Sequence, residues 1–179
     1  MRKLLTLFVM IGFGFGYSPA ADPADLVITN ALLVDGRGGV YDRSTIVVDD
    51  GRIREISKDN TITGQITIDA DGRTVMPGLM DVHVHLTDFQ IVVSDSTRDV
   101  FLQQQIPSMF RKYLEYGVTT IKNTGDLRDA MLTLKARLKS GDLQGPRLLV
   151  VGPPLTAWGG HPAASLFREN EWFRSRGAA

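Results

Sequence analysis

The sequence predicts an α/β fold in two parts, and two patterns lead to this prediction. Over residues 21–75, short β-rich runs alternate with Gly-containing turns, which is typical of a small all-β unit. From residue 76 onward, β-branched runs alternate with helical patterns across short links, which is the order of a parallel βαβ sheet. The 179 residues carry equal numbers of acidic and basic side chains, so charge gives no reason to expect nucleic acid as a partner.

The first residues have the pattern of a secretory signal peptide. Arg2 and Lys3 precede an apolar run over residues 4–17, and small residues follow at 18–21. We therefore expect residues 1–20 to be a signal peptide and the mature chain to be exported, to a bacterial periplasm, without stable insertion in the membrane. An uncleaved membrane anchor is the alternative. The chain has no cysteine, which excludes disulfides, thiolate metal sites and a cysteine nucleophile.

The predicted all-β unit contains turn signals between its apolar runs. Asp49-Asp50-Gly51 separates two such runs and predicts a hairpin of residues 44–48 with residues 52–56. Asp71-Gly72 predicts a second hairpin over residues 67–75. No cluster of chemically active residue types accompanies these strands, so we expect this unit to be structural.

The strand predicted over residues 75–86 carries the strongest chemical signal. Side chains alternate along a strand, which places Asp81, His83 and His85 on one face. Two imidazoles side by side on a strand can hold one metal ion; two structural histidines on a buried strand are the alternative. Pro77-Gly78 is expected to form the turn that leads into the strand.

Helices and strands are predicted in alternation after this strand. The first helix contains Pro107, which either kinks the helix or begins its restarted part. Asp126 is expected to cap the N-terminus of the second helix, whose apolar stripe packs on the sheet. The predicted elements are helix 98–116, strand 118–122, helix 127–140, strand 145–152 and the start of a helix at 166–176.

Three strings resemble the amidohydrolase superfamily of metal-dependent hydrolases. Pro-Gly-Leu-Met-Asp-Val-His-Val-His-Leu at residues 77–86 resembles its first barrel strand, and residues 116–120 resemble its second. The loop at residues 152–161 is similar to that of the imidazolonepropionase- and prolidase-like members. The resemblance implies that residues 76–179 form about three βα units of an incomplete (β/α)8 TIM-type barrel, since a complete one takes about 250 residues. It also implies that residues 21–75 are part of a small β-sandwich that precedes the barrel.

The resemblance further implies which residues form the site. His83 and His85 would ligate a divalent metal, with one or two ions in a complete family member. Zinc is the expected metal, and iron, nickel and cobalt are alternatives for paired imidazoles. His161 would line the substrate pocket, with a structural loop role as its alternative. Lys122, at the end of the second predicted barrel strand, either faces that pocket or is a surface or rim lysine.

The function implied by the resemblance is metal-dependent hydrolysis of a C–N bond in a small amide, a dipeptide or a cyclic amide. The other metal ligands of the family and its general base belong to later barrel strands that this sequence does not contain. We therefore expect a truncated chain that is inactive alone. A non-catalytic exported binding module with a remnant metal-binding strand is the alternative. A third hypothesis is that self-association or a separately encoded chain completes the barrel.

Overall fold

A computed structural model describes residues 23–87, 92–157, 159–161, 164, 165, 168 and 170–175. The predicted signal peptide lies outside these residues. The chain divides between Met76 and Pro77 into two compact units, each of which is described by itself. Among the described residues, no helix has the length and apolar character needed to cross a membrane.

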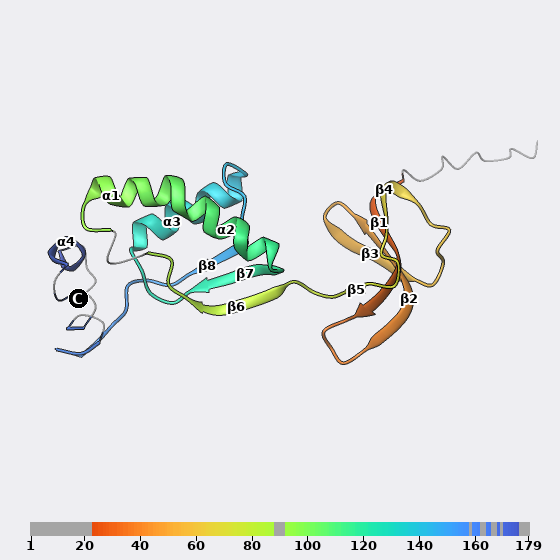
Figure 1. Cartoon of the computed structure of the whole chain (residues 1–179), viewed down its shortest axis with the longest axis horizontal. Helices are drawn as coiled ribbons and strands as arrows, with labels where there is room; N and C mark the ends of the chain where they lie inside the picture. The colour runs from red at the N-terminus through yellow and green to blue at the C-terminus, as the bar shows by residue number, and fades with distance from the viewer. Residues whose placement is uncertain are drawn as a thin grey trace, which may run out of the picture. The chain divides into compact units, whose positions relative to one another are not determined.

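The first unit is a five-stranded sheet (Figure 1). Its strands lie in the order β3-β2-β1-β4, and β5 pairs with β1 beyond the end of β4. β2 is antiparallel to both of its neighbours, whereas β4 and β5 run parallel to β1. The strands are β1 (Ala24–Val34), β2 (Val40–Asp49), β3 (Arg52–Ser57), β4 (Gly64–Asp69) and β5 (Thr74–Val75).

The predicted hairpin around Asp50 and Gly51 is confirmed. β2 and β3 pair as antiparallel neighbours on either side of these two residues. Their φ values are 48° and 66°, so both central residues are left-handed, as a type I′ hairpin turn requires. Glycine reaches this region without strain and aspartate tolerates it, which explains why this dipeptide identified the turn.

The second predicted hairpin is wrong. Asp71-Gly72 does form a turn with positive φ values, but the strands on either side both pair with β1 and not with each other. Backbone bonds continue through the turn, from the Gly72 N–H to the Asn30 carbonyl at 2.8 Å and from the Leu32 N–H to the Arg73 carbonyl at 3.1 Å. The free edge of β1 thus satisfies both segments, and the turn serves as an irregularity within one parallel ladder.

The second unit contains a parallel three-stranded sheet in the order β6-β7-β8, with helices between the strands (Figure 1). This is the predicted βαβ order, and the strands and two long helices lie close to their predicted residues. The strands are β6 (Leu79–Val84), β7 (Val118–Asn123) and β8 (Arg147–Val150). The helices are α1 (Asp95–Val100), η1 (Phe101–Gln105), α2 (Ile106–Glu115), α3 (Arg128–Ser140) and α4 (Glu171–Arg174).

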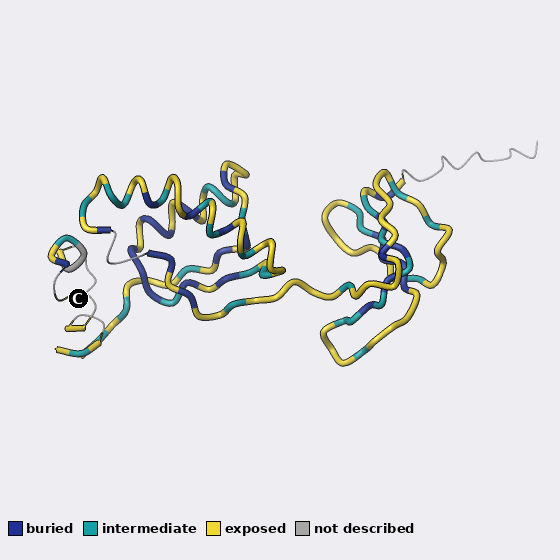
Figure 2. Tube along the Cα trace, viewed as in Figure 1, coloured by how far each residue is buried: buried dark blue, intermediate teal, exposed yellow. Residues whose placement is uncertain are grey.

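The core of this unit lies between the sheet and helices α2 and α3 (Figure 2). Ile121 of β7 and Met131 of α3 are both completely buried there. On the other face of the sheet, Met80 and Leu149 are 69% and 45% exposed. Among the described residues, helices cover one face of the sheet only. An incomplete (β/α)8 barrel presents such a sheet, because the other face is the one that barrel closure encloses.

Pro107 lies near the start of α2, directly after one wide helical turn. The chain stays helical there, because α1, η1 and α2 follow one another without a gap, and Pro107 lies in the first turn of α2, as one of the two alternatives predicts. The Ile106 N–H donates to the carbonyl of Phe101, five residues earlier, as in a π-helix. Proline lacks an N–H and its ring crowds the preceding turn, so the wider turn accommodates the residue within one continuous helix.

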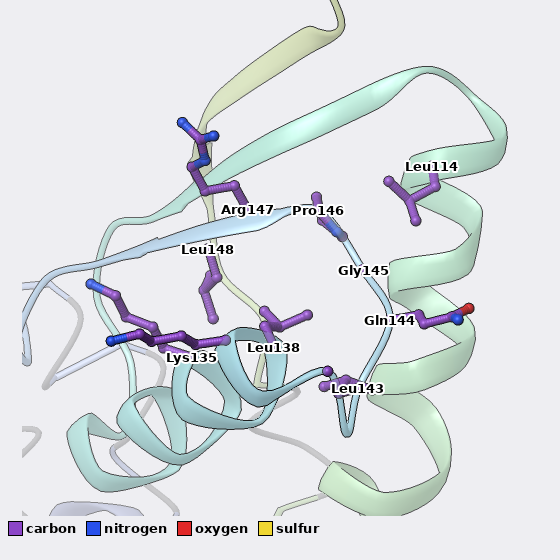
Figure 3. Close-up of a pocket in the computed structure, with 11 residues that line it drawn as sticks. Leu114, Lys135, Leu138, Leu143, Gln144, Gly145, Pro146, Arg147 and Leu148 are labelled. Atoms are coloured by element: carbon purple, nitrogen blue, oxygen red, sulfur yellow. The ribbon is translucent and has the colours of Figure 1, made fainter. Parts of the chain in front are cut away.

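A groove of about 720 Å³ lies at the amino-terminal end of β8 (Figure 3). Its apolar lining comes from the ends of α2 and α3 and from the loop that leads into β8, including Leu114, Leu138 and Leu143. Lys135 and Arg147 also line it. Because the three strands are parallel, this groove lies at the opposite end of the sheet from the carboxyl ends of the strands.

Candidate metal site

The two histidines of the candidate metal site lie at the carboxyl end of β6. His83 belongs to the strand and His85 directly follows it. Both side chains are exposed, whereas Val84 between them is buried among the helices. The imidazole centroids are 5.4 Å apart, with the ring planes at 69° to each other. The histidines therefore share the sheet face that no described helix covers.

The prediction that Asp81 lies on the same face is wrong. Asp81 pairs opposite Ile121, but Val84 pairs opposite Asn123, so β6 contains one extra residue between the two pairs. The extra residue shifts the alternation of faces, as in a β-bulge. Ile121 is fully buried on the side of the helices. Burial, and to a lesser extent the charge of Asp81, raises the pKa of Tyr113 in α2.

Asp81 instead supports the backbone of β6 next to His83. Its carboxylate accepts a hydrogen bond from the His83 N–H at 3.1 Å. This bond satisfies a backbone donor where the β6–β7 pairing is irregular. Asp81 thus acts on His83 through the main chain.

The imidazole of His85 is held through its Nδ1 atom. Nδ1 lies 2.8 Å from the carbonyl oxygen of Gly125, in the loop after β7. A carbonyl only accepts hydrogen bonds, so Nδ1 carries a proton in this contact, and in the neutral imidazole Nε2 is then the unprotonated nitrogen. Metal-binding histidines use this arrangement, in which a bond at one ring nitrogen orients the other toward the metal.

Asp126 is the residue of this region whose role the sequence did not reveal. It is 2% exposed, and its Oδ2 accepts hydrogen bonds from the N–H groups of Leu86 and Thr87 at 3.0 and 2.9 Å. Asn123 donates to the same oxygen at 3.0 Å, and the Leu127 N–H donates to Oδ1 at 2.8 Å.

The predicted role of Asp126 as a helix cap is therefore wrong. The N-cap position of α3 is Leu127, whose side chain makes no capping bond. The carboxylate turns toward the neighbouring strand because two backbone donors at the end of β6 lack strand partners there. The available signal was the polar string Asn-Thr-Gly-Asp directly after a buried strand, where parallel sheets place functional residues.

The two imidazoles fit part of a metal site. They offer imidazole nitrogens on one exposed face, and the bond to Gly125 engages Nδ1 of His85 and leaves Nε2 as the possible ligand atom. Within the described part of the chain, no group of three or more His, Asp or Glu side chains is placed to hold an ion. His83 and His85 would thus supply two ligands, and water or other groups would fill the remaining positions.

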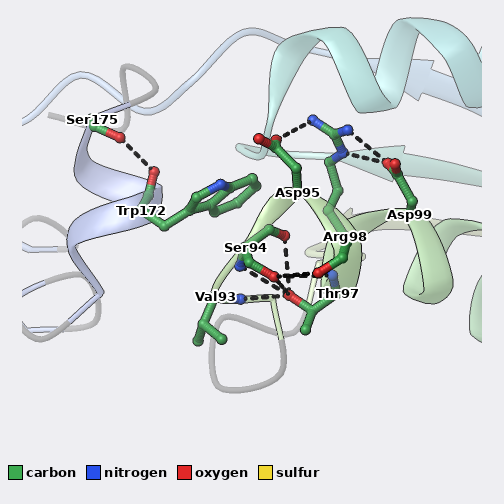
Figure 4. Close-up of polar contacts among 9 residues, drawn as sticks. Val93, Ser94, Asp95, Thr97, Arg98, Asp99, Trp172 and Ser175 are labelled. Atoms are coloured by element: carbon green, nitrogen blue, oxygen red, sulfur yellow. Dashed lines mark hydrogen bonds and ion pairs between the residues drawn. The ribbon is translucent and has the colours of Figure 1, made fainter.

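The segment after the histidines returns to the helical layer at Val92, whose side chain is fully buried. Residues 88–91 lie outside the described residues, and Ser94 then starts α1 with a capping box that it forms with Thr97. Arg98 pairs with both Asp95 and Asp99 on the first turns (Figure 4).

The last described segment of the chain reaches this same region. The Asn170 side chain donates to the Val92 carbonyl at 2.9 Å, and Trp172 of α4 packs against the core. The segment that follows β8 and the segment that follows β6 thus lie side by side.

His161 and Lys122 differ in their position relative to the two histidines of β6. His161 is exposed, and its Nδ1 lies 2.6 Å from the Ser165 hydroxyl, so its described contact is local to its own loop. Lys122 pairs opposite Leu149 and alternates with the buried residues Ile121 and Asn123. Lys122 therefore projects from the uncovered face, which is the face of the histidines.

Comparison with known proteins identifies relatives of the chain. The model of the amidohydrolase family matches residues 74–176. A dihydroorotase from Trichlorobacter lovleyi is 43% identical over 65 residues, which are 36% of this chain and 15% of that protein. A 5'-deoxyadenosine deaminase from Methanosarcina acetivorans is 36% identical over 122 residues, which are 66% of this chain and 26% of that protein.

Solved structures show the same relationship at the level of the fold. The chain is similar to a Xaa-Pro dipeptidase whose crystal structure holds methionine in the active site, with a TM-score of 0.63 and 30% identity. The match covers 78% of this chain and 36% of the dipeptidase. The chain thus spans about a third of the length of this solved relative, and 15% and 26% of the two proteins above.

Proposed function

Because the chain belongs to the amidohydrolase family of hydrolases, we propose that it provides the first metal ligands of an exported enzyme that hydrolyses C–N bonds. The observation that carries the proposal is the pair His83 and His85, which lies exposed at the carboxyl end of the first barrel strand. Active sites of (β/α)8 barrels are built at this end of the strands. The groove of Figure 3 lies at the other end, so we do not include it in the site.

The chemistry that a divalent ion supplies in such a site is a lowered pKa for bound water and polarisation of the scissile carbonyl. In this chain, His83 and His85 would hold the ion, and the Gly125 carbonyl would keep the proton of His85 on Nδ1. The described residues bring no carboxylate or further histidine to these two ligands. Hydrolysis of a substrate therefore requires further side chains from outside the described residues.

The proposed substrates are small molecules with an amide, dipeptide or cyclic amide bond. Two features support this class: the family match, and the similarity to a dihydroorotase and to a Xaa-Pro dipeptidase. Zinc is the proposed metal, because neutral imidazoles are among its usual ligands. The basic and apolar pattern of residues 1–20 supports the proposal of export to a periplasm.

The first experiment is to measure the metal content of the purified chain beside the double variant His83→Ala/His85→Ala. We expect zinc in the wild type and its loss in the variant. His161→Ala is the matched control, because it removes an exposed imidazole outside β6 and should leave the metal content unchanged. Metal binding that survives the double substitution, or is absent from folded wild type, would contradict the proposal.

A second measurement addresses the uncovered sheet face. We propose that further barrel strands, whether in the same polypeptide or in an associating chain, cover Met80 and Leu149 in the active enzyme. Sedimentation and metal-dependent hydrolysis of a dipeptide, measured on the same sample, test this. An active monomer of this chain alone would overturn the requirement for further strands, and a folded, metal-bound but inactive monomer would support it.

A further inference from the structure

The carboxyl end of β6 is held by a single short loop, residues 123–126. The Thr124 N–H donates to the Val84 carbonyl at 2.9 Å, just before His85. The Gly125 carbonyl accepts the proton of His85 Nδ1, and Asp126 accepts the N–H groups of the two residues after His85. The residues before and after the histidine, and the histidine itself, are therefore all fixed by one loop.

Within this loop, the Asp126 carboxylate makes the largest number of contacts. Three donors converge on Oδ2 and a fourth reaches Oδ1. One of them is the side-chain amide of Asn123, whose own oxygen accepts from the Gly125 N–H at 3.3 Å. The carboxylate thus ties the loop that presents the Gly125 carbonyl to the backbone that carries His85.

The position of Asp126 requires a side chain that only accepts hydrogen bonds, because all of its partners are donors. Each contact of the carboxylate is an N–H group that points at an oxygen, which an ionised carboxylate satisfies with both of its atoms. An amide in the same place presents one oxygen and one NH₂ group, so at least one donor would face another donor. Unpaired buried N–H groups are costly, and the loop would move to expose them.

We infer that Asp126 is the positioning residue of the proposed metal site. Asp126 holds the imidazole of His85 in the tautomer that is protonated at Nδ1, and this leaves Nε2 as the ligand atom. This inference rests on the proposed function only for its last step, the binding of metal. The step before it, control of the tautomer of His85, is a property of the metal-free chain. The two can therefore fail separately.

The test is the tautomer of His85, read by long-range ¹⁵N–¹H correlation of the imidazole at about pH 8, above the ordinary imidazole pKa. In the wild type, Nδ1 should be the protonated nitrogen. In Asp126→Asn the protonated nitrogen should become a mixture of Nδ1 and Nε2, while the signals of His161 stay unchanged. Zinc affinity should fall about tenfold or more, as for other residues that orient a metal-bound histidine.

Two controls separate positioning from general loss of stability. Thr87→Val removes a buried hydroxyl that has no hydrogen-bond partner among the described residues, at the same end of β6, and should leave the His85 tautomer unchanged. Met131→Ala weakens the core from α3 without removing a hydrogen bond of Asp126 and should also leave the tautomer unchanged. Asp126→Ala, if folded, should show a larger effect than Asp126→Asn.

An unchanged His85 tautomer in folded Asp126→Asn would overturn the inference, as would an equal change in Met131→Ala. If Asp126→Ala does not fold, the comparison of Asp126→Asn with wild type still tests the inference, because the aspartate and asparagine side chains have nearly the same shape. A tautomer that depends on Asp126 in a chain that binds no zinc would support the inference about Asp126 while contradicting the proposed function.

Discussion

Gly78 and Thr119 approach each other so closely at the start of β6 and β7 that no side chain fits at position 78. A Cβ built on Gly78 would overlap the Thr119 side chain. Gly78 has no positive φ and lies in an extended link, so the prediction that it forms a turn is wrong. The glycine is required for close approach of the strands and not for a special backbone conformation.

We expect Gly78→Ala to lower the free energy of unfolding by roughly 1–3 kcal/mol, the usual cost of overpacking. Urea denaturation measures this. Gly152→Ala is the control, since a Cβ at Gly152 meets no atom within 4 Å and the stability should change little. Adding Thr119→Ala should recover part of the loss, because it removes Oγ1 and Cγ2, whereas the Thr119 Cβ, 2.7 Å from the built Cβ, remains. A double variant no more stable than Gly78→Ala would contradict the contact with these two atoms as a cause.

Two neighbouring residues of α3 should respond differently to truncation. Met131 is completely buried against the sheet, whereas Leu132 is 45% exposed. Met131→Ala should lower the free energy of unfolding by roughly 2–5 kcal/mol, because it leaves a cavity in the core. Leu132→Ala should change it by about 0.5 kcal/mol or less. Similar losses in thermal unfolding of the two variants would show that the helix faces are assigned wrongly.

The stability of the second unit should fall at alkaline pH because of Tyr113. Burial, and secondarily the charge of Asp81, raises the pKa of Tyr113 above its ordinary value of 10.0. The folded state therefore binds the phenolic proton more tightly than the unfolded state, and stability is lost as the pH rises from 10.0 through the folded pKa. Below that window the tyrosine contributes no pH dependence.

The variant Tyr113→Phe tests this prediction about stability at alkaline pH. The difference in stability between wild type and Tyr113→Phe should be constant at neutral pH and should shift in favour of the variant above about pH 10. Tyr116→Phe serves as the control, because Tyr116 is 81% exposed. Parallel curves for wild type and Tyr113→Phe across the alkaline range would argue against burial of the Tyr113 hydroxyl as the cause of a raised pKa.

The first unit should lose stability in acid through Asp35. The backbone N–H groups of Arg37 and Gly39 donate to its carboxylate at 2.7 and 2.9 Å and hold its pKa below the ordinary value of 3.8. A lowered pKa in the folded state means that the contribution is complete above 3.8 and is lost as the pH falls through the folded pKa. Asp35→Asn should flatten this part of the acid profile.

The acid profile is measured by unfolding at a series of pH values below about 5. Asp42→Asn is a suitable control, since the described residues place no hydrogen-bond donor on the exposed Asp42 carboxylate. Should Asp35→Asn retain the full acid dependence of the wild type, the turn after β1 would not be the source of it.

Patterns local in the sequence were sufficient for much of the fold. The Asp50-Gly51 turn follows from the backbone preferences of two residues, and the stripe of α3 follows from helical spacing. The pair His83 and His85 was identified in the same way, because strand alternation alone puts the two imidazoles on one face. The family membership of the second unit, too, was visible in these short strings.

Tertiary contacts decided the rest, because they depend on which strand edge or loop lies nearby. β4 and β5 share the edge of β1, so the turn at Asp71-Gly72 makes no hairpin. The extra residue in β6 turns Asp81 away from the histidines, and pairing with β7 is what reveals it.

The roles of Asp126 and of the Gly125 carbonyl arise in the same way, since their partners at the end of β6 are about forty residues away in the chain. Sequence alone determined the local elements and the histidine pair of the proposed metal site. Only the tertiary structure determined how the imidazole of His85 is oriented, because its orientation is set by hydrogen bonds between segments distant in the sequence.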